Sequence, residues 1–377
     1  MKNNISRRKF ITSSSLLAAA YVYTNDVTLA QPIDRKDFSF MLLGDLHFDK
    51  LSHHDMEYVK ARYPNDISQI QHYSLVTERY LPSLLKKVKR EGKASGADFY
   101  IQLGDFLEGL CGSKSLAQLQ ATEFIELIDK QRLGRPFYVI KGNHDITGEG
   151  AAEVFDETVL PWQSSLHRKK LDSACTSFVH HDTRFVFFDC YRAKESLAWL
   201  KEDLKQLREK NLIFLVHMPV ISFNARSTWT VFSKESDASY RKELLDLLAA
   251  HQAIVFCAHL HKTCVLKREG NQGSITQVCL GSVIDPTQTT IKDHLQGIDR
   301  YGENLVDLEP EFHPESLALR KAILNREKPS ISFFEYADFC GYAKVVIKAD
   351  GSIRYSMYQN DDREVWKEFD LRKLVKV

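Results

Sequence analysis

The sequence predicts an α/β fold in which a mostly parallel or mixed β-sheet is covered by helices. Three observations support this class: short apolar runs alternate with helix-patterned stretches, polar residues follow the ends of those runs, and the last runs follow one another without helices between them. The chain has 377 residues, 44% of them hydrophobic, so it can bury a large core. A single large domain of this length is common among α/β enzymes.

The predicted strands and helices alternate along most of the chain. Apolar runs predict strands over 38–43, 98–103, 137–140, 184–189, 212–216 and 253–257. Apolar residues at helical spacing predict helices over 81–93, 117–130 and 194–210. The later runs 274–280, 342–347 and 352–358 have no helices between them, which predicts antiparallel strands.

Residues 1–30 are predicted to be an export signal. Arg7 and Arg8 are followed by Lys9 and Phe10, then by a weakly apolar stretch that ends in small residues near Ala30. This pattern resembles a twin-arginine signal; an ordinary Sec signal or a chance basic terminus is the alternative. The apolar stretch is too short for a stable membrane span. We therefore expect a periplasmic or secreted protein that the twin-arginine machinery exports in the folded state.

Charge and cysteine content exclude some classes of partner. Lys and Arg number 51 against 50 Asp and Glu, a net charge of +1, so we expect no nucleic-acid polymer as a partner, although a nucleotide could still be a substrate. The seven cysteines are odd in number and form no CxxC motif. We therefore expect the cysteines to be small apolar residues of the core and to form no disulfide framework.

Two segments of the remaining domain, 31–377, are predicted to be insertions, 218–236 and 284–330. Asn224, Arg226 and Trp229 in the first could line a substrate cleft. Arginine binds phosphate through two hydrogen bonds, and tryptophan stacks on flat rings. A solvated surface loop is the alternative.

Seven side chains suited to metal binding stand in or near the segments that follow predicted strands. They are Asp45, His47, Asp105, Asn143, His217, His259 and His261. In α/β sheets, ligands bind at the carboxyl ends of the strands. Alternate residues of an extended segment share a face, so the residues of each Asp-x-His or His-x-His pair can reach one ion. Oxygen and imidazole donors without thiolates favour two neighbouring divalent or trivalent ions, with Mn, Fe or Zn preferred over Ca or Mg.

Together these motifs resemble the calcineurin-like metallophosphoesterase superfamily. Its pattern is DxH, GDxx(D/E), GNH(D/E), a single His and GHxH, and the resemblance runs from about residue 38 to residue 261. The resemblance implies a four-layer α/β/β/α sandwich, with two mixed β-sheets flanked by helices. Residues 31–377 would then be a metallophosphoesterase catalytic domain.

The resemblance also implies roles for single residues. One ion would be held by Asp45, His47, Asp105 and His261. The second ion would be held by Asp105, Asn143, His217 and His259. His144 would contact the substrate phosphate without binding metal, and Glu108 would orient His144.

The chain departs from the family pattern at two positions. Ala258 stands where the GHxH motif has glycine, and Glu108 replaces the more common Asp. Purple acid phosphatases, which belong to the same superfamily, carry a metal-binding Tyr at the position of Glu108. We therefore expect no tyrosinate–iron centre at that position.

The expected activity is metal-dependent hydrolysis of a small phosphodiester or phosphomonoester. Two ions ~3.5–4 Å apart lower the pKa of a bridging water towards ~7, and the resulting hydroxide attacks phosphorus in line. His144, as an imidazolium, would stabilise the developing charge or protonate the leaving oxygen. The alternatives are a catalytically silent metal-binding scaffold of the same fold, a pyrophosphatase or a nucleotide-directed hydrolase.

The other histidines are predicted to be structural. They are His53, His54, His72, His167, His180, His181, His251 and His313. His180 and His181 fall at a predicted hairpin turn. His294 is considered as a substrate contact because it follows the ligand-bearing region.

Overall fold

The structure is a computed structural model that describes residues 36–282, 291–309, 317–359 and 364–375. These residues belong to one compact unit, Arg35–Val377. The predicted export signal, part of the predicted insertion 284–330 and His313 lie outside the described residues. None of the helices in the described part of the chain combines the length and apolarity needed to cross a bilayer.

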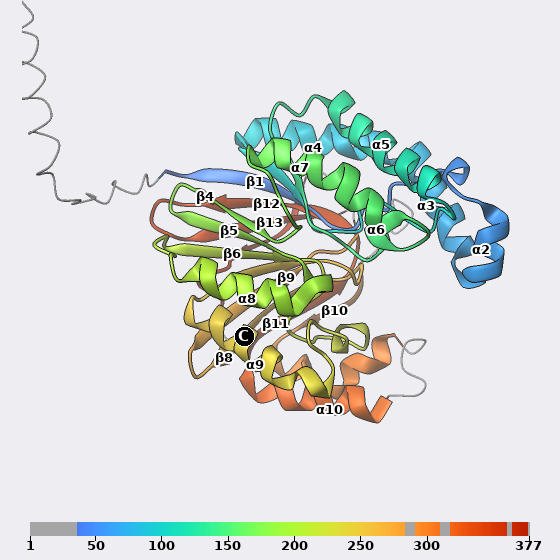
Figure 1. The fold of residues 1–377 in the computed structure, drawn as a ribbon. Helices are drawn as coiled ribbons and strands as arrows, with labels where there is room; N and C mark the ends of the chain where they lie inside the picture. The colour runs from blue at the N-terminus through green and yellow to red at the C-terminus, as the bar shows by residue number, and fades with distance from the viewer. Residues whose placement is uncertain (1–35, 283–290, 310–316, 360–363, 376–377) are drawn as a thin grey trace, which may run out of the picture. The chain divides into compact units, whose positions relative to one another are not determined.

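A six-stranded mixed sheet carries the first half of the motif residues (Figure 1). Its strand order is β14-β13-β12-β1-β2-β3. The strands are β1 (Phe38–Leu43), β2 (Phe99–Gln102), β3 (Phe137–Val139), β12 (Gly341–Ile347), β13 (Ile353–Gln359) and β14 (Val365–Asp370). β1, β2 and β3 are parallel, and β12, β13 and β14 extend the sheet in antiparallel fashion from β1.

An eight-stranded mixed sheet carries the second half of the motif residues. Its order is β10-β11-β8-β9-β7-β6-β5-β4. The strands are β4 (Thr176–His180), β5 (Thr183–Phe188), β6 (Asn211–Val216), β7 (Ile254–Cys257), β8 (Thr263–Gly270), β9 (Gly273–Cys279), β10 (Lys292–Gln296) and β11 (Ile331–Asp338). β5, β6, β7 and β9 are parallel, while the strands outside them pair antiparallel.

Helices cover the outer faces of both sheets, as Figure 1 shows. Those on the side of the six-stranded sheet are α2 (Met56–Arg62), α3 (Ile67–Arg79), α4 (Leu81–Ser95), α5 (Lys114–Gln131), α6 (Ala151–Val154) and α7 (Leu160–His167). Those on the side of the eight-stranded sheet are α8 (Ala193–Leu204), α9 (Ala238–Ala250) and α10 (Leu317–Glu327). The predicted arrangement of two mixed sheets between helical layers is confirmed.

Strands with two buried faces hold the layers together. In β1, Phe40 and Leu42 lie in the core between the two sheets, whereas Met41 and Leu43 pack under the helices. Successive strand residues point to opposite faces, so a continuous apolar run fills two cores at once. This explains why the strands appear in the sequence as unbroken apolar runs.

Two predicted elements differ in detail from the structure. The run 274–280 falls largely within β9, which is antiparallel to β8, as predicted, but parallel to β7. The helix predicted over 194–210 ends as α8 at Leu204, and hydrogen bonds from Gln206 N to Asp203 O and from Leu207 N to Leu204 O tighten the chain after it. Such three-residue turns are common where a helix ends.

The loop after β6 packs against α10 and its neighbourhood. Arg320 of α10 donates to Ala225 O, and its guanidinium lies 3.9 Å from the centre of the Trp229 ring. Asn224 Nδ2 donates to Glu309 Oε2 at 2.7 Å. The two segments predicted to be insertions therefore contact each other.

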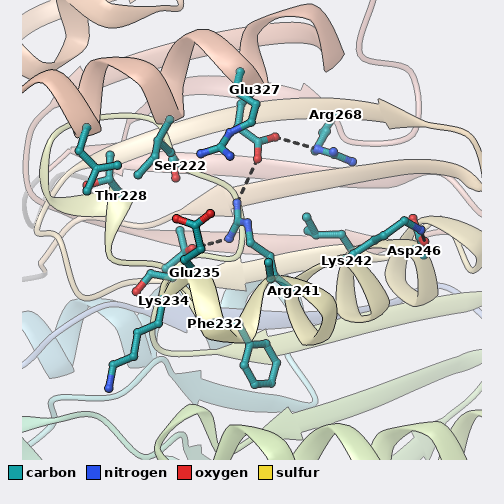
Figure 2. Close-up of a pocket in the computed structure, with 17 residues that line it drawn as sticks. Ser222, Thr228, Phe232, Lys234, Glu235, Arg241, Lys242, Asp246, Arg268 and Glu327 are labelled. Carbon is teal, nitrogen blue, oxygen red and sulfur yellow. Dashed lines mark hydrogen bonds and ion pairs between the residues drawn. The ribbon is translucent and has the colours of Figure 1, made fainter.

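A pocket of about 500 Å³ lies between this loop, α9 and α10 (Figure 2). In its wall, Glu327 accepts from Arg241 at 3.1 Å and from Arg268 at 2.9 Å. None of the predicted metal ligands lines this pocket. It is therefore separate from the candidate site.

Candidate metal centre

The predicted ligands lie where parallel strands of both sheets end. Asp45, Asp105 and Asn143 follow β1, β2 and β3, and His217 follows β6. His259 comes just after β7. Parallel neighbours end at the same edge of a sheet, so these side chains converge.

The first ligand group consists of Asp45, His47 and His261, whose ligand atoms all lie within 4.8 Å of one another. The Nε2 atoms of His47 and His261 are 3.0 Å apart. Asp45 Oδ2 lies 3.9 Å from His261 Nε2. All three side chains come from loops after β1 and β7.

The second ligand group consists of Asp105, His217 and His259, again within 4.8 Å. His217 Nε2 is 3.0 Å from Asp105 Oδ2 and 3.2 Å from His259 Nδ1. His217 Nδ1 also lies 3.8 Å from Asp45 Oδ1, so the two groups adjoin. Each group contains three of the four residues that the family resemblance assigns to one ion.

The donor atoms fit cations. Asp45 Oδ2 is buried and has no hydrogen-bond partner among the described residues, which is costly for a carboxylate oxygen. Two imidazole nitrogens that face each other at 3.0 Å, as in His47 and His261, must share a proton or a cation. Imidazole and carboxylate donors in such an arrangement suit transition metals.

Four of the predicted ligands have left-handed backbone conformations. The φ angles are 47° at His47, 53° at Asp105, 73° at His259 and 56° at His261. Non-glycine residues rarely adopt positive φ, and such strain is concentrated at functional sites.

Two motif glycines allow the ligand loops to approach closely. A Cβ on Gly142 would lie 2.1 Å from Asp105 Oδ1, and a Cβ on Gly104 would lie 2.3 Å from His217 Nδ1. Either contact is far inside van der Waals distance. The glycines before Asp105 and Asn143 are therefore required by packing at the centre.

Asn143 and His144 lie beside the Asp105 carboxylate. The main-chain N–H of His144 donates to Asp105 Oδ1 at 2.8 Å. The Tyr191 hydroxyl donates to Asn143 Oδ1 at 3.4 Å. Since Gly142 and His144 both touch Asp105, Asn143 stands between two residues that border the second ligand group.

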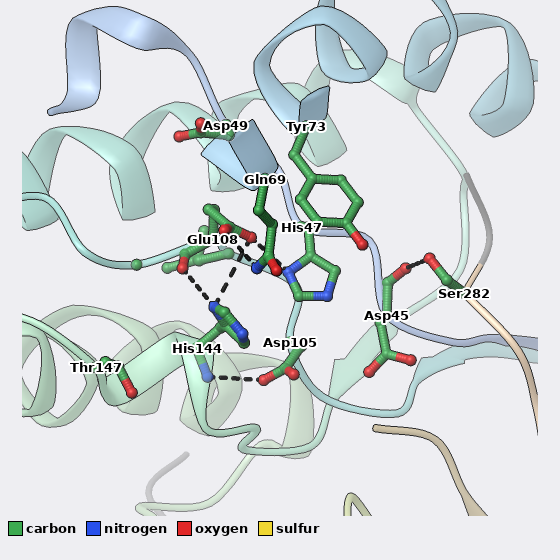
Figure 3. A network of polar contacts seen from close by, with 12 residues as sticks. Asp45, His47, Asp49, Gln69, Tyr73, Asp105, Glu108, His144, Thr147 and Ser282 are labelled. Carbon is green, nitrogen blue, oxygen red and sulfur yellow. Dashed lines mark hydrogen bonds and ion pairs between the residues drawn. The ribbon is translucent and has the colours of Figure 1, made fainter. Parts of the chain in front are cut away.

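Glu108 differs from its expected role (Figure 3). Its carboxylate Oε2 accepts from His47 Nδ1 at 2.7 Å, and Oε1 accepts from Gln69 at 2.8 Å. His144 Nδ1 is 3.8 Å from that carboxylate but donates to the main-chain carbonyl of Glu108 at 2.8 Å. The expected orienting contact is thus made by the Glu108 backbone. The methylene that Glu has beyond Asp lets the carboxylate reach His47 instead.

Buried carboxylates control the charge of the imidazoles. Burial lowers the pKa of His47, but nearby carboxylates, first Glu108, raise it to about 9. For His217, burial again lowers the pKa and Asp105 raises it, also to about 9. Burial, and then His217, lowers the pKa of His259 to about 3. The acidic groups of the centre therefore attract positive charge strongly.

Asp145 ties the loops of the centre together. Its carboxylate accepts from the main-chain N–H groups of Asp105, Leu107 and Gly142 at 2.7–3.0 Å. Burial, followed by the charge of Asp105, raises its pKa to about 7. Asp145 occupies the last place of the GNH(D/E) motif, which is the sequence signal that could have indicated this role.

Three polar residues near the centre were not singled out from the sequence. Gln69 and Tyr73 come from α3, and Tyr191 comes from the short turn Cys190–Arg192. They belong to none of the motifs, so no spacing in the sequence marks them. Their contacts arise only from tertiary packing.

The loop 218–236 approaches the centre through Arg226. Its guanidinium donates to the carbonyls of Leu260 and His259, both at 3.3 Å. Asn224, in contrast, is fully buried, and Trp229 is 52% exposed. Of the three residues predicted as possible cleft residues, only Arg226 contacts the metal-binding loops in the structure.

His294, His180 and His181 make their contacts outside the two ligand groups. His294 Nε2 pairs with Glu335 at 2.9 Å, and the ring packs edge-on to Trp366. His181 lies in the turn between β4 and β5, and His180 pairs with Asp98 at 3.0 Å. Asp98, His180 and His181 form a separate, half-buried group of possible ligand atoms.

Comparison with known proteins identifies the family. Residues 38–263 match the family model described as calcineurin-like phosphoesterase, and the chain belongs to this family. It is 23% identical over 240 residues to tartrate-resistant acid phosphatase type 5 of Sus scrofa, a match that covers 57% of this chain and 68% of the relative. The Homo sapiens protein of the same name is 25% identical over 229 residues, covering 54% and 67%.

Solved structures agree in fold. The structure of PhoD aligns with a TM-score of 0.51 at 9% identity, covering 89% of this chain and 69% of that one. A dimetal phosphatase from Danio rerio aligns with a TM-score of 0.50 at 11% identity, covering 88% and 98%. These structures support the fold. The family match and the acid phosphatase relatives identify the protein as a metal-dependent phosphoester hydrolase.

Proposed function

We propose that the protein is an exported metallophosphoesterase that hydrolyses a small phosphomonoester or phosphodiester at a two-metal centre. The observation that carries this proposal is the pair of adjoining ligand groups at the carboxyl ends of β1–β3 and β6–β7. Asp105 would serve both ions: its Oδ2 lies 3.0 Å from His217 Nε2, and His217 Nδ1 in turn lies 3.8 Å from Asp45 of the first group.

The bound ions would activate a water molecule and polarise the phosphoryl oxygens. Asp45, His47 and His261 would hold one ion together with Asp105. Asn143, His217 and His259 would hold the other with the same carboxylate. Hydrogen bonds hold the side chains of His47, His217 and Asp45 in place, so these ligands need little reorganisation before catalysis.

His144 is proposed to act on the substrate directly. Its Nδ1 donates to the Glu108 carbonyl, which can only accept, so this nitrogen carries a proton and Nε2 stays available for the substrate. The side chain is 19% exposed, which leaves it accessible. A proton on Nε2 would stabilise charge on the phosphoryl group or pass to the leaving oxygen.

For the metals and the substrate, we propose classes and not single species. The donor set supports Mn, Fe or Zn. The name of the relatives, acid phosphatase, supports a phosphomonoester. A phosphodiester, a pyrophosphate and a nucleotide are the alternatives, and a catalytically silent scaffold is the alternative outside catalysis.

A panel assay tests the proposal. The purified protein is loaded with Mn, Zn or Fe and assayed with p-nitrophenyl phosphate, bis-p-nitrophenyl phosphate, pyrophosphate and cyclic nucleotides. We expect two ions at the centre and turnover of at least one substrate, and we expect Asp105→Asn to lose metal and activity together. Because Asp98, His180 and His181 could add an ion, the count is repeated in His180→Ala/His181→Ala. Two bound ions without turnover of any substrate would favour the scaffold.

Export is proposed from residues 1–30. The support is the Arg7-Arg8 pattern and the weakly apolar stretch that follows. The seven cysteines all lie within the described residues and form no disulfide, so folding and metal loading require none. Such a protein can acquire its metals before it crosses the membrane and act in the periplasm or outside the cell.

A further inference from the structure

Helix α3 lies along the outer side of the first ligand group. It belongs to the segment between the DxH motif and the GDxxE motif, and no motif covers it. Gln69 and Tyr73 are four residues apart on this helix, so they share one face. Figure 3 shows both side chains next to His47 and Glu108.

Tyr73 contacts both imidazoles of the first group. Its ring is stacked on His47, with ring centres 4.2 Å apart and planes 13° from parallel. Its hydroxyl oxygen lies 3.3 Å from His261 Nδ1. Tyr73 is 7% exposed, so these contacts are shielded from water.

Gln69 acts on His47 through Glu108. The Gln69 amide donates to Glu108 Oε1 at 2.8 Å, and Glu108 Oε2 accepts from His47 Nδ1 at 2.7 Å. Gln69 thereby orients the carboxylate that holds the imidazole. The chain Gln69–Glu108–His47 is a hydrogen-bonded relay from α3 to the first group.

These contacts leave one nitrogen of each ring for an ion. A carboxylate on Nδ1 of His47 requires the proton to be there, so Nε2 presents its lone pair. In His261, an ion on Nε2 would leave the proton on Nδ1, and Nδ1–H can then donate a hydrogen bond to the Tyr73 oxygen. The two Nε2 atoms face each other at 3.0 Å.

The position of α3 is set independently of these histidines. Ser74 Oγ donates to Asp49 Oδ2 at 2.7 Å, and Asp49 N donates to Thr77 Oγ1 at 2.9 Å. Asp49 is fully buried and lies two residues after His47. The helix is therefore anchored to the loop that carries the first ligands.

The second ligand group is held by other parts of the chain. His217 Nδ1 donates to the main-chain carbonyl of Leu103 at 2.8 Å. Asn143, the proposed further ligand of this site, accepts a hydrogen bond from Tyr191 in the turn Cys190–Arg192. The two groups thus have separate supports.

We propose that α3 sets the ion affinity of the first site and not that of the second. Gln69 and Tyr73 are positioning residues: they fix the orientation of His47 and His261 and touch neither the ions nor the substrate. This proposal rests on the proposed two-metal centre. Loss of an outer contact of this kind typically lowers metal affinity by about 10–100-fold.

The test is a metal titration of chelated, full-length protein by calorimetry, with Mn²⁺ as the probe. We expect Gln69→Leu and Tyr73→Leu to weaken one of two binding phases by about 10–100-fold and to leave the other within about threefold. Tyr73→Phe keeps the stacked ring and should have a smaller effect. Tyr191→Phe, which removes the matching hydroxyl at the second group, should weaken the other phase instead.

Two controls separate positioning from loss of folding. Gln71→Leu makes the same change at an exposed position of α3 and should leave both phases unchanged. The circular dichroism spectra and Tm of the chelated variants show whether each is folded. A high Mn²⁺ concentration should restore kcat in Gln69→Leu and Tyr73→Leu to near the wild-type value.

The outcomes distinguish this proposal from the proposed function. If the wild-type protein binds fewer than two Mn²⁺ ions at the centre, the two-metal function fails. If it binds two ions and turns over substrate, yet Tyr73→Leu and Gln69→Leu leave both phases unchanged or weaken them equally, α3 has no selective role. Loss of kcat that saturating metal does not restore also contradicts a positioning role.

Discussion

His144 combines a hydrogen bond from Nδ1 to a main-chain carbonyl with a partly exposed side chain, and it is not among the predicted metal ligands. We predict that His144→Ala keeps both ions and lowers kcat by about 10²–10⁴-fold, the usual contribution of a general acid. The loss should be greatest for alkyl phosphates, whose leaving oxygen needs a proton. Metal analysis and kcat on an alkyl phosphate and on p-nitrophenyl phosphate measure both effects.

The comparison of leaving groups is the control for this prediction. A p-nitrophenolate leaves without protonation, so His144→Ala should retain more of its activity on that substrate. Full turnover of the alkyl ester by the variant would show that His144 does not act on the leaving oxygen.

Single residues could be predicted from the sequence where a motif marks them. Asp45, His47 and Asp105 stand at family positions, and the structure brings them together with the later histidines. The target of the Glu108 carboxylate could not be predicted, because it depends on how far one side chain reaches in the folded protein. The contacts of Tyr73 with the ligand histidines could not be predicted either, because they depend on where α3 packs in the folded protein.

At the scale of elements, α7 places His167 in an apolar environment. The ring lies 4.6 Å from the centre of Tyr138 and 5.2 Å from that of Phe187. Its Nδ1 has no hydrogen-bond partner among the described residues. Burial, and then the charge of Lys169, lowers the pKa of His167 to about 4.

This histidine is predicted to reduce stability in acid. Its pKa in the unfolded chain is about 6.5, so below that pH the unfolded state binds a proton that the folded state refuses until about pH 4. Stability is therefore lost as pH falls from about 6.5 to 4. Between pH 7 and pH 4.5, the free energy of unfolding should fall by about 1–2 kcal/mol less in His167→Leu than in the wild-type protein.

Urea unfolding of both proteins at the two pH values measures the difference. The wild-type protein also contains buried carboxylates that respond to acid, and subtracting the two pH dependences removes their contribution. An equal loss of stability in His167→Leu and wild type would mean that His167 titrates normally.

Elements could be predicted where apolar runs are continuous. β1 coincides with its predicted run, and β6 differs from its run by one residue. β8 was not predicted, because its second half carries Lys267, Arg268 and Glu269 at an exposed end. The parallel pairing of β9 with β7 could not be predicted either, since pairing partners are distant in the sequence.

The whole molecule combines a folded domain with a predicted export signal. We predict that replacing Arg7 and Arg8 by Lys together stops export, because twin-arginine recognition depends on the guanidinium pair and not on charge alone. Fractionation of cells that express the full chain measures this. The wild-type protein should occur in the periplasm or the medium, and the double variant should remain inside.

A matched change provides the control for export. Lys2→Arg alters a basic residue outside the pair and should leave export unchanged. Export of the double Lys variant at the wild-type level would indicate a Sec-type signal instead.

The arrangement of the layers was the feature of the fold that was hardest to predict from the residues alone. Alternating runs indicated a mixed sheet under helices, but the division into two sheets came from the family resemblance. The reason is that a buried run such as β1 faces apolar neighbours on both sides, whether the second layer is helix or sheet.

The left-handed backbone restricts which amino acids can replace the parental residue at four positions: His47, Asp105, His259 and His261. Glycine would relax the main chain but supply no donor atom, and asparagine would tolerate the conformation but lack the charge or the ring. Each of the four positions therefore needs both a residue that tolerates this backbone conformation and a side chain with the right donor atom. A saturation library selected for hydrolysis should therefore recover almost only the parental amino acid at each of them, while neighbouring loop positions accept many.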